Sequence, residues 1–114
     1  MSQFDVYPSP AARNRAFPYL VQLQADVVGA SSRDRVVAPL IPAALLPETD
    51  SVLLPLVHLA GAPYRVGVPL MRAMPERLMG TAIGNVGDAR WTLLNAIDRL
   101  FSGDRKSTRL NSSH

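Results

Sequence analysis

Few side chains in this sequence have the chemistry for acid–base catalysis, and the clearest candidate is His58, the only histidine before residue 104. A catalytic imidazole works with a nucleophile or a carboxylate beside it. No constellation with a second histidine, a cysteine or a serine accompanies this one. It stands in an apolar run. In an extended chain, Leu54 and Leu56 would point to the same side as His58. We therefore predict that His58 is packed in the core or in an interface, and that the protein has no catalytic residues.

Carboxylates can bind a metal ion or act as an acid–base pair, but the acidic residues are scattered along the chain. Glu48 and Asp50 lie closest together, in a polar stretch that is typical of a solvated turn. The sequence contains no cysteine, which excludes thiolate metal sites and disulfide bonds. The sequence thus predicts neither a metal site nor a bound cofactor.

Basic side chains suited to nucleic-acid phosphates form one loose group, at Arg13, Arg15, Arg33 and Arg35. The whole chain has a formal net charge of +3, but without residues 104–114 it has 9 basic and 8 acidic residues, a net charge of +1. Binding along phosphates relies on several clustered Lys or Arg contacts. A nearly neutral domain is therefore expected to meet DNA only indirectly, through a protein partner.

Residues 104–114, with the sequence DRKSTRLNSSH, are polar and show no hydrophobic period. They also match, codon by codon, the translation of a common sequencing-library adapter. A chain of 114 residues has room for one compact core. We therefore predict a folded domain over residues 1–103 and a non-native, disordered tail over residues 104–114.

Alternation of apolar and polar residues predicts that most of the domain consists of short strands. Pro39 favours an edge or a strand end for the third strand, because proline cannot donate to a sheet ladder. The run over residues 52–59 is apolar on both parities, which favours a central strand paired in a hairpin with residues 64–68. The connections are short, so the strands are expected to be antiparallel. The strands are expected over residues 4–7, 17–28, 35–40, 52–59, 64–68 and 77–83.

The clearest helix follows Asp88, a good N-cap residue. Gly103 stands where a helix commonly ends. The predicted fold class is therefore mainly β with one C-terminal α-helix. Apolar side chains at helical spacing are expected to pack this helix on the core, at Trp91, Leu94, Ile97 and Phe101, joined by Leu93 and Leu100.

Six short motifs follow one another along residues 3–103: QFDVY from Gln3, QADVV from Gln24, RVVAPL from Arg35, PLVHL from Pro55, Met74-Pro75 and NAIDRLF from Asn95. In this order they resemble the CcdB toxin family. The resemblance implies a CcdB/MazF-like (SH3-like) barrel, in which an antiparallel sheet, a small second sheet and a terminal helix pack together. It also implies a two-fold symmetric homodimer.

The same resemblance implies the toxin of a type II toxin–antitoxin system, which binds the DNA gyrase A subunit and traps the complex of gyrase with cleaved DNA. Such a toxin is no enzyme, because it acts by binding one state of its target better than another. A CcdA-type antitoxin would neutralise it, and the pair would co-repress its own operon, as in plasmid maintenance. The sequence shows no signal-peptide pattern and no run of roughly 18 apolar residues, so a soluble, cytoplasmic protein is expected.

Two departures from the family pattern are expected to weaken gyrase binding. Ser102 stands where the best-known member of the family has a tryptophan, a residue that commonly dominates interface energies. Asp104, the first residue of the predicted tail, replaces the apolar residue with which the family pattern ends. The resemblance also implies that the antitoxin contacts residues 9–15 and 41–46. The gyrase contacts implied by the resemblance are Val27, Val28, Asp98, Phe101, Ser102 and Gly103.

Two other functions compete with this one. A MazF- or Kid-type ribonuclease toxin shares the fold, but it needs basic side chains to hold RNA phosphates, and the nearly neutral domain offers few. An inactive CcdB-like binding module, such as a peptide-binding barrel, would have no effect on growth when expressed. RNA cleavage without gyrase would favour the ribonuclease.

Overall fold

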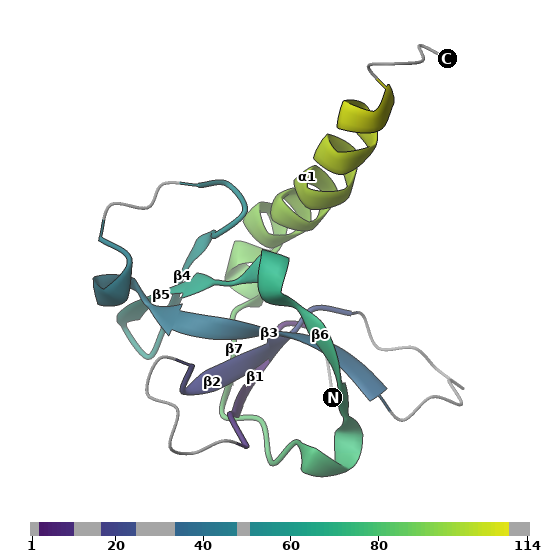
Figure 1. Ribbon diagram of the computed structural model, residues 1–114. Coiled ribbons are helices and arrows are strands. Elements are labelled where there is room, and N and C mark those ends of the chain that lie inside the picture. Colours follow the sequence, from purple (N-terminus) through teal and green to yellow (C-terminus); the bar gives the residue numbers. More distant parts are fainter. Residues whose placement is uncertain (1–2, 11–16, 25–33, 48–50, 110–114) are drawn as a thin grey trace.

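The computed structural model describes residues 3–10, 17–24, 34–47 and 51–109, with side chains up to Ser102. These residues form one antiparallel, barrel-like sheet of seven short strands and a C-terminal helix (Figure 1). The predicted mainly β fold with a terminal helix is confirmed. None of the described helices is long and apolar enough to cross a membrane.

The strands are β1 (Asp5–Pro8), β2 (Tyr19–Gln22), β3 (Asp34–Pro42), β4 (Leu56–Leu59), β5 (Ala62–Val66), β6 (Arg72–Pro75) and β7 (Gly84–Asn85). The helices are α1 (Arg90–Arg109) and the short 3-10 helices η1 (Ala43–Leu45), η2 (Val68–Leu70), η3 (Glu76–Leu78) and η4 (Gly87–Ala89).

Strand β3 organises the sheet, because it pairs with three other strands. Along one edge it pairs with β2, where Val21 stands opposite Ala38. Along the other edge its C-terminal half pairs with β5 and its N-terminal half with β6. The sheet continues through β2 and β1 to β7 on one side and through β5 to β4 on the other. Among the described residues, the expected small second sheet is therefore joined to the main sheet through β3.

Pro39 lies inside β3, and the predicted edge or strand-end position is wrong. On the side of β5 and β6, β3 changes partners here: β5 ends opposite Leu40, and β6 begins opposite Val37. The Pro39 carbonyl accepts a hydrogen bond from the Gly67 backbone N–H at 2.8 Å on this side. The N–H that proline lacks would point the same way as its carbonyl. The proline thus lies between the part of β3 that pairs with β5 and the part that pairs with β6, where its missing N–H removes no hydrogen bond to either strand.

The predicted central strand over residues 52–59 is wrong in length and in position. Only residues 56–59 form a strand, β4, and it stands at the end of the sheet with β5 as its one partner among the described strands. The hairpin of β4 with β5 is confirmed. Val57 is buried, whereas Val52 and Leu56 are exposed. The run is apolar on both parities because both faces of the hairpin carry hydrophobic side chains, although only one face is covered.

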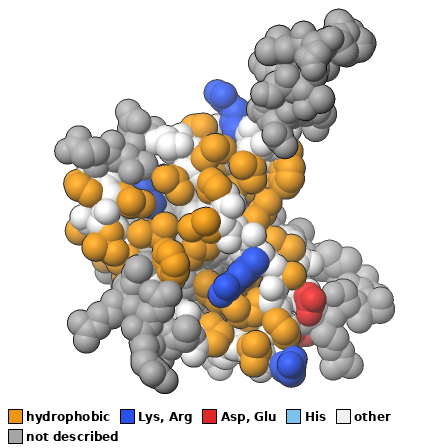
Figure 2. All heavy atoms as spheres, in the orientation of Figure 1, with side chains coloured by type: hydrophobic (Ala, Val, Ile, Leu, Met, Phe, Trp, Pro, Cys, Tyr) orange, Lys and Arg blue, Asp and Glu red, His pale blue; other side chains and the backbone are white. Residues whose placement is uncertain are grey.

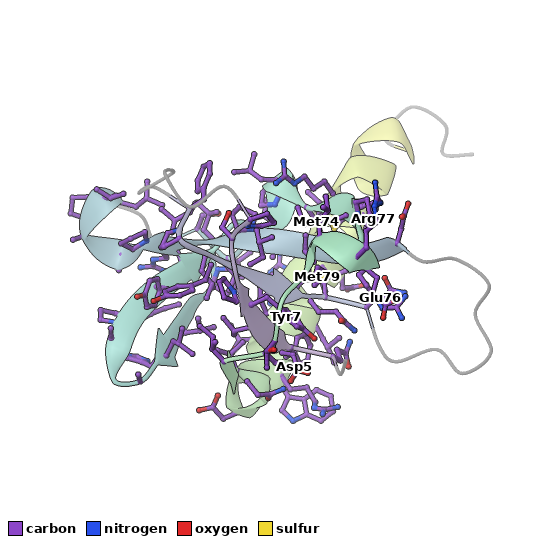
Figure 3. The ribbon with its side chains drawn as sticks, turned by 90° about the horizontal axis from the view of Figure 1, so that it is seen from below. Asp5, Tyr7, Met74, Glu76, Arg77 and Met79 are labelled. Carbon is purple, nitrogen blue, oxygen red and sulfur yellow. The ribbon has the colours of Figure 1, made fainter. Side chains whose placement is uncertain are left out.

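The predicted last strand over residues 77–83 is also wrong, because this stretch covers the sheet and does not extend it. It starts within η3 and leads to β7, and its Met79 is buried against one face of the sheet. Figure 3 shows Tyr7, Met74 and Met79 lying together on this face. The cluster, called the lower core here, consists of Tyr7, Leu20, Val37, Met74 and Met79.

The opposite face of the sheet carries the main core. Successive side chains of a strand point to opposite faces, so the neighbours of the lower-core residues face the helix. Val6 and Val21 stand opposite each other in β1 and β2 and are fully buried. Leu93 and Ala96 of α1 close this core. The packing of α1 against the sheet therefore determines where the exposed side chains of the helix lie.

The β4–β5 hairpin turns at Ala60 and Gly61, whose φ angles are 54° and 84°. Two-residue hairpin turns with positive φ at both positions match the twist of the strands, and Asn-Gly is their favoured sequence. An alanine in this region is strained by its Cβ atom, whereas glycine and asparagine adopt it readily.

Replacing Ala60 by asparagine is therefore expected to raise the free energy of unfolding by about 0.5–1 kcal/mol. Urea denaturation followed by circular dichroism measures this change. The matched control is Ala62→Asn, an exposed position two residues later in β5, where asparagine fits a strand poorly. An equal gain in both variants would show that the turn geometry is not the cause.

Candidate protein-binding site

The start of α1 differs from the prediction. Asp88 lies inside η4, the 3-10 helix that precedes α1, and the N-cap residue of η4 is Val86, with no side-chain cap hydrogen bond. Asn85 supplies an acceptor instead, because its Oδ1 atom accepts a hydrogen bond from the Gly87 backbone N–H at 2.7 Å. The chain thus enters α1 from β7 through η4, and the last residue of β7 satisfies the first N–H group of η4.

The buried stripe of α1 agrees with the prediction in part, because Leu94 and Ile97 are partly buried and pack against the main core. Leu93 and Ala96 are fully buried, whereas Trp91, which was expected to pack on the core, is 78% exposed. The helix carries apolar residues on several sides, so more than one stripe fits helical spacing. Packing against the sheet selects the stripe through Leu93 and leaves Trp91 outside.

Helix α1 does not end at Gly103 but continues to Arg109. A glycine inside a helix costs only about 1 kcal/mol relative to alanine, so a helix can pass through it. Residues 104–109 thus have a helical backbone where disorder is predicted, and residues 110–114 lie outside the described part of the chain. The non-native origin of residues 104–114 stays a prediction.

Three of the predicted contact residues lie together in one turn of α1. Asp98, Phe101 and Ser102 are three and four positions apart, a spacing that places side chains next to one another on a helix surface. The Phe101 ring is 51% exposed, Asp98 is exposed and Ser102 is partly buried. Gly103 continues the same helix. The turn offers a partner an aromatic ring with a carboxylate beside it.

Phe101 borders a small pocket of about 280 Å³ between α1 and the sheet, called the helix pocket here. Because Leu23 and Gln24 directly follow β2, this pocket joins the helix to the segment that leads to Val27 and Val28. Those two valines lie outside the described residues, so their contact role stays a prediction. The helix pocket is lined by Leu23, Gln24, Val36, Met71, Ile97 and Phe101.

Hydrogen bonds hold the chain after β2 against β3 at this pocket. The Leu23 N–H donates to the Val36 carbonyl at 2.9 Å. The Val36 N–H donates to Oε1 of Gln24 at 2.7 Å, and the Gln22 side-chain amide donates to the Gln24 carbonyl at 2.9 Å. Two glutamine side chains thus extend the ladder beyond β2 and fix one wall of the helix pocket.

His58 is exposed on β4, so it does not lie in the core, and its predicted alternative place in an interface stays a prediction. It lines a second pocket of about 440 Å³ with Tyr19 and Tyr64, whose rings meet edge to face at 5.8 Å. Burial raises the pKa of Tyr64, and Tyr19 raises it further. The described lining of this pocket includes hydrogen-bond donors but no carboxylate, serine or cysteine beside the imidazole.

Of the loose arginine group, only Arg35 lies in the described part of the chain. Its guanidinium is 3.4 Å from a carboxylate oxygen of Glu76. A carboxylate repels a phosphate, so this pair disfavours phosphate binding at Arg35. Arg13, Arg15 and Arg33 lie outside the described residues.

Hydrophobic side chains cover much of one face of the molecule (Figure 2). Residues 41–46, the second predicted contact region, form the end of β3 and η1, and Leu45 there is 55% exposed. Of residues 9–15, Ser9 and Pro10 are described and the others are not. Large exposed apolar surfaces mark interaction sites more often than free surface. The exposed large hydrophobic residues are Leu45, Val52, Leu56, Leu70, Leu78, Ile83, Trp91 and Phe101.

One comparison with known proteins bears on this site. The family model for the CcdB protein matches residues 3–103 of the chain. The matched region includes the helix pocket and all six predicted contact residues.

Proposed function

Because this chain belongs to the CcdB family, whose members are gyrase-targeting toxins of toxin–antitoxin systems, we propose that it binds the DNA gyrase A subunit and traps the complex of gyrase with cleaved DNA. It does so without a covalent step of its own. A protein that binds the DNA-cleaved state more tightly than the closed state increases the population of the cleaved state. Moving that equilibrium from 1:99 to 99:1 takes a preference of roughly 10⁴-fold.

The observation that carries this proposal is the exposed aromatic ring of Phe101, beyond the buried turns of α1. Phe101 is 51% exposed, although Leu93 and Ala96 on the preceding turns are fully buried. Aromatic side chains commonly anchor protein interfaces, and the helix pocket beside the ring offers space for an apolar side chain of the partner. Asp98 adds a carboxylate suited to a basic group.

DNA supercoiling and cleavage assays with purified gyrase test this proposal. We expect cleaved DNA to accumulate when the protein, gyrase and ATP are present together, and no cleavage when gyrase is left out. Binding to the isolated A subunit is measured by calorimetry. No association at micromolar concentration, or cleavage of RNA in the absence of gyrase, would overturn the proposal, and the second result would favour the ribonuclease.

A chain ending at Gly103 is expected to poison gyrase at about a tenfold lower concentration than the full chain, a difference of about 1.4 kcal/mol. Helix α1 runs past Gly103 to Arg109, so its extra turns stand where the partner would approach the contact residues. A chain ending at Arg109 keeps those turns and serves as the control, and a chain ending with Ile at position 104 restores the family pattern. Equal poisoning by all four chains would contradict this prediction.

We propose that a CcdA-type antitoxin covers residues 41–46 and 9–15, that the complex represses its own operon, and that the toxin is a homodimer. The exposed Leu45 on η1 and the apolar face of Figure 2 support partners of this kind. Light scattering on the chain ending at Gly103 tests the dimer. A strictly monomeric protein at micromolar concentration would contradict it.

A further inference from the structure

Asn85 joins three segments of the chain through one side-chain amide. Its Nδ2 atom donates to the Gln3 carbonyl at 3.2 Å and to Oδ1 of Asp5 at 2.9 Å, and its Oδ1 atom accepts from the Gly87 N–H at 2.7 Å. The donor group meets two oxygens and the acceptor meets an N–H, so this orientation of the amide satisfies both ends. The start of β1, the end of β7 and the entry into α1 are thus fixed to one another.

The segment that Asn85 holds is strained. Phe4 has a φ of 70°, in the left-handed region that side chains other than glycine rarely adopt. Its backbone is held on both sides, because the Phe4 N–H donates to the Gln22 carbonyl at 2.7 Å and the Val86 N–H donates to the Phe4 carbonyl at 2.9 Å. Such a conformation persists only where the surroundings determine it. The bonds of Asn85 to the residues on either side of Phe4 are part of those surroundings.

Two further contacts lead from this point to the helix and to the helix pocket. The Arg90 guanidinium, at the first position of α1, stands 5.9 Å from the centre of the buried Phe4 ring. The Gln3 side chain donates to the Leu23 carbonyl at 3.0 Å, and Leu23 lines the helix pocket beside Phe101. The strained turn therefore contacts the first residue of α1 and, through Gln3, the Leu23 side of the helix pocket.

We propose that Asn85 is a positioning residue, which fixes the direction of α1 relative to the sheet and thereby places Asp98 and Phe101 for a partner. The apolar contacts of Leu93 hold the helix against the core but have little directionality, whereas hydrogen bonds have defined geometry. With a rise of 1.5 Å per residue, Phe101 lies about 16 Å along the helix from Arg90, so a tilt of about 10° moves it by about 3 Å. The placement follows from the contacts, and its consequence for binding rests on the proposed gyrase contact.

Distance measurements between spin labels test the positioning role without any partner. The chain contains no cysteine, so cysteines introduced at the exposed positions Arg72 on β6 and Arg99 on α1 carry the labels alone. Labelled protein is diluted into unlabelled protein, so that each distance lies within one chain. We expect one narrow distance distribution in the parent and a shifted or broadened one in Asn85→Ala, while thermal unfolding stays cooperative. An unchanged distribution in Asn85→Ala would overturn the proposal.

A second variant disturbs the same amide without removing it. A Cβ atom added at Gly87 would lie 2.6 Å from Oδ1 of Asn85, so Gly87→Ala is expected to displace the amide and to shift the distribution in the same way. If Asn85→Ala fails to fold, Gly87→Ala provides the measurement. Thr92→Ala, an exposed change in the first turns of α1, is the control and should leave the distribution unchanged. An equal shift in Thr92→Ala would overturn the assignment to Asn85.

Exchanging the two polar partners separates positioning from a general loss of stability. Asn85→Asp alone keeps the acceptor for Gly87 but places a carboxylate against Asp5, so a shifted distribution is expected. Combining it with Asp5→Asn restores a donor–acceptor pair between the two positions, but not the bond to the Gln3 carbonyl, and is therefore expected to return the distribution part of the way to that of the parent. If the double variant recovers stability but none of the distance shift, the proposal is wrong.

Binding assays on unlabelled protein connect this role to function. Asn85→Ala is expected to bind the gyrase A subunit about tenfold more weakly than the parent, and the Asp5→Asn, Asn85→Asp pair to bind more tightly than Asn85→Asp alone. If the parent itself does not bind the A subunit, the proposed function fails, whereas the distance measurements still decide whether Asn85 positions the helix. Parent-like binding by Asn85→Ala, with a shifted helix, would overturn the link to the binding surface.

Discussion

Replacing Phe101 by alanine is expected to weaken binding to the gyrase A subunit by about 30-fold or more, a loss of about 2 kcal/mol or more. The ring is 51% exposed and borders the helix pocket. It is therefore accessible to a partner that also contacts the pocket. A half-exposed side chain contributes little to folding. The free energy of unfolding is therefore expected to change by less than about 1 kcal/mol. Calorimetric titration and urea denaturation measure the two effects.

Trp91 provides the matched control for this experiment. It is an aromatic residue on the same helix, it is 78% exposed, and it precedes the proposed contact turn. Trp91→Ala is expected to bind the A subunit as the parent chain does. If the two variants lose affinity equally, the contact is not confined to the turn of α1 around Phe101. If neither loses affinity, Phe101 is not an anchor.

The second large effect concerns stability. Leu93→Ala is expected to lower the free energy of unfolding by about 2–5 kcal/mol. Leu93 is fully buried in the main core, where α1 meets the sheet, so the substitution removes packing and leaves a cavity. A small domain is stable by only about 5–15 kcal/mol, so much of its stability would be lost. Urea denaturation measures the change, provided that the m-value, the slope of the unfolding free energy against urea concentration, is the same in parent and variant.

Leu78→Ala is the control for the core substitution. Leu78 is 49% exposed on η3, and an exposed leucine loses little on truncation, with an expected change within about 0.5 kcal/mol. A similar loss from both variants would mean that Leu78 is covered in solution, as it would be in a dimer interface. A small loss from Leu93→Ala would contradict the placement of α1.

The elements predicted correctly are those whose signals are local. Residues 4–7 alternate in polarity, and the hairpin before residue 66 is marked by its turn and its apolar run. In contrast, β6 and β7 exist because β3 and β1 pair with them. Their residues show no alternation that distinguishes them from loops. Pro39 misleads for the same reason, since its tolerance depends on a change of strand partners that no local pattern reveals.

The candidate site was predictable only in part. The resemblance to the CcdB family indicated Asp98, Phe101 and Ser102, and the structure places all three in one helical turn. The helix pocket was not foreseen, because Met71 and Val36 reach it from elements far apart in the sequence. Trp91 shows the limit of helical periodicity, which identifies a stripe but not its orientation when several sides of a helix are apolar. The role of Asn85 was not predictable from the sequence, because its three hydrogen-bond partners are known only from the fold and its sequence neighbours do not mark it.

Strand β3 contributes side chains to both hydrophobic cores, and this affects how the domain unfolds. Val37 belongs to the lower core and Ala38 to the main core, so neighbouring residues of one strand support opposite sides of the sheet. If either cluster melts, the strand on which the other depends is released, and partial unfolding of one side alone is disfavoured. The domain is therefore expected to lose both hydrophobic layers in a single all-or-none transition, which preserves a rigid base for the helix until the whole fold gives way.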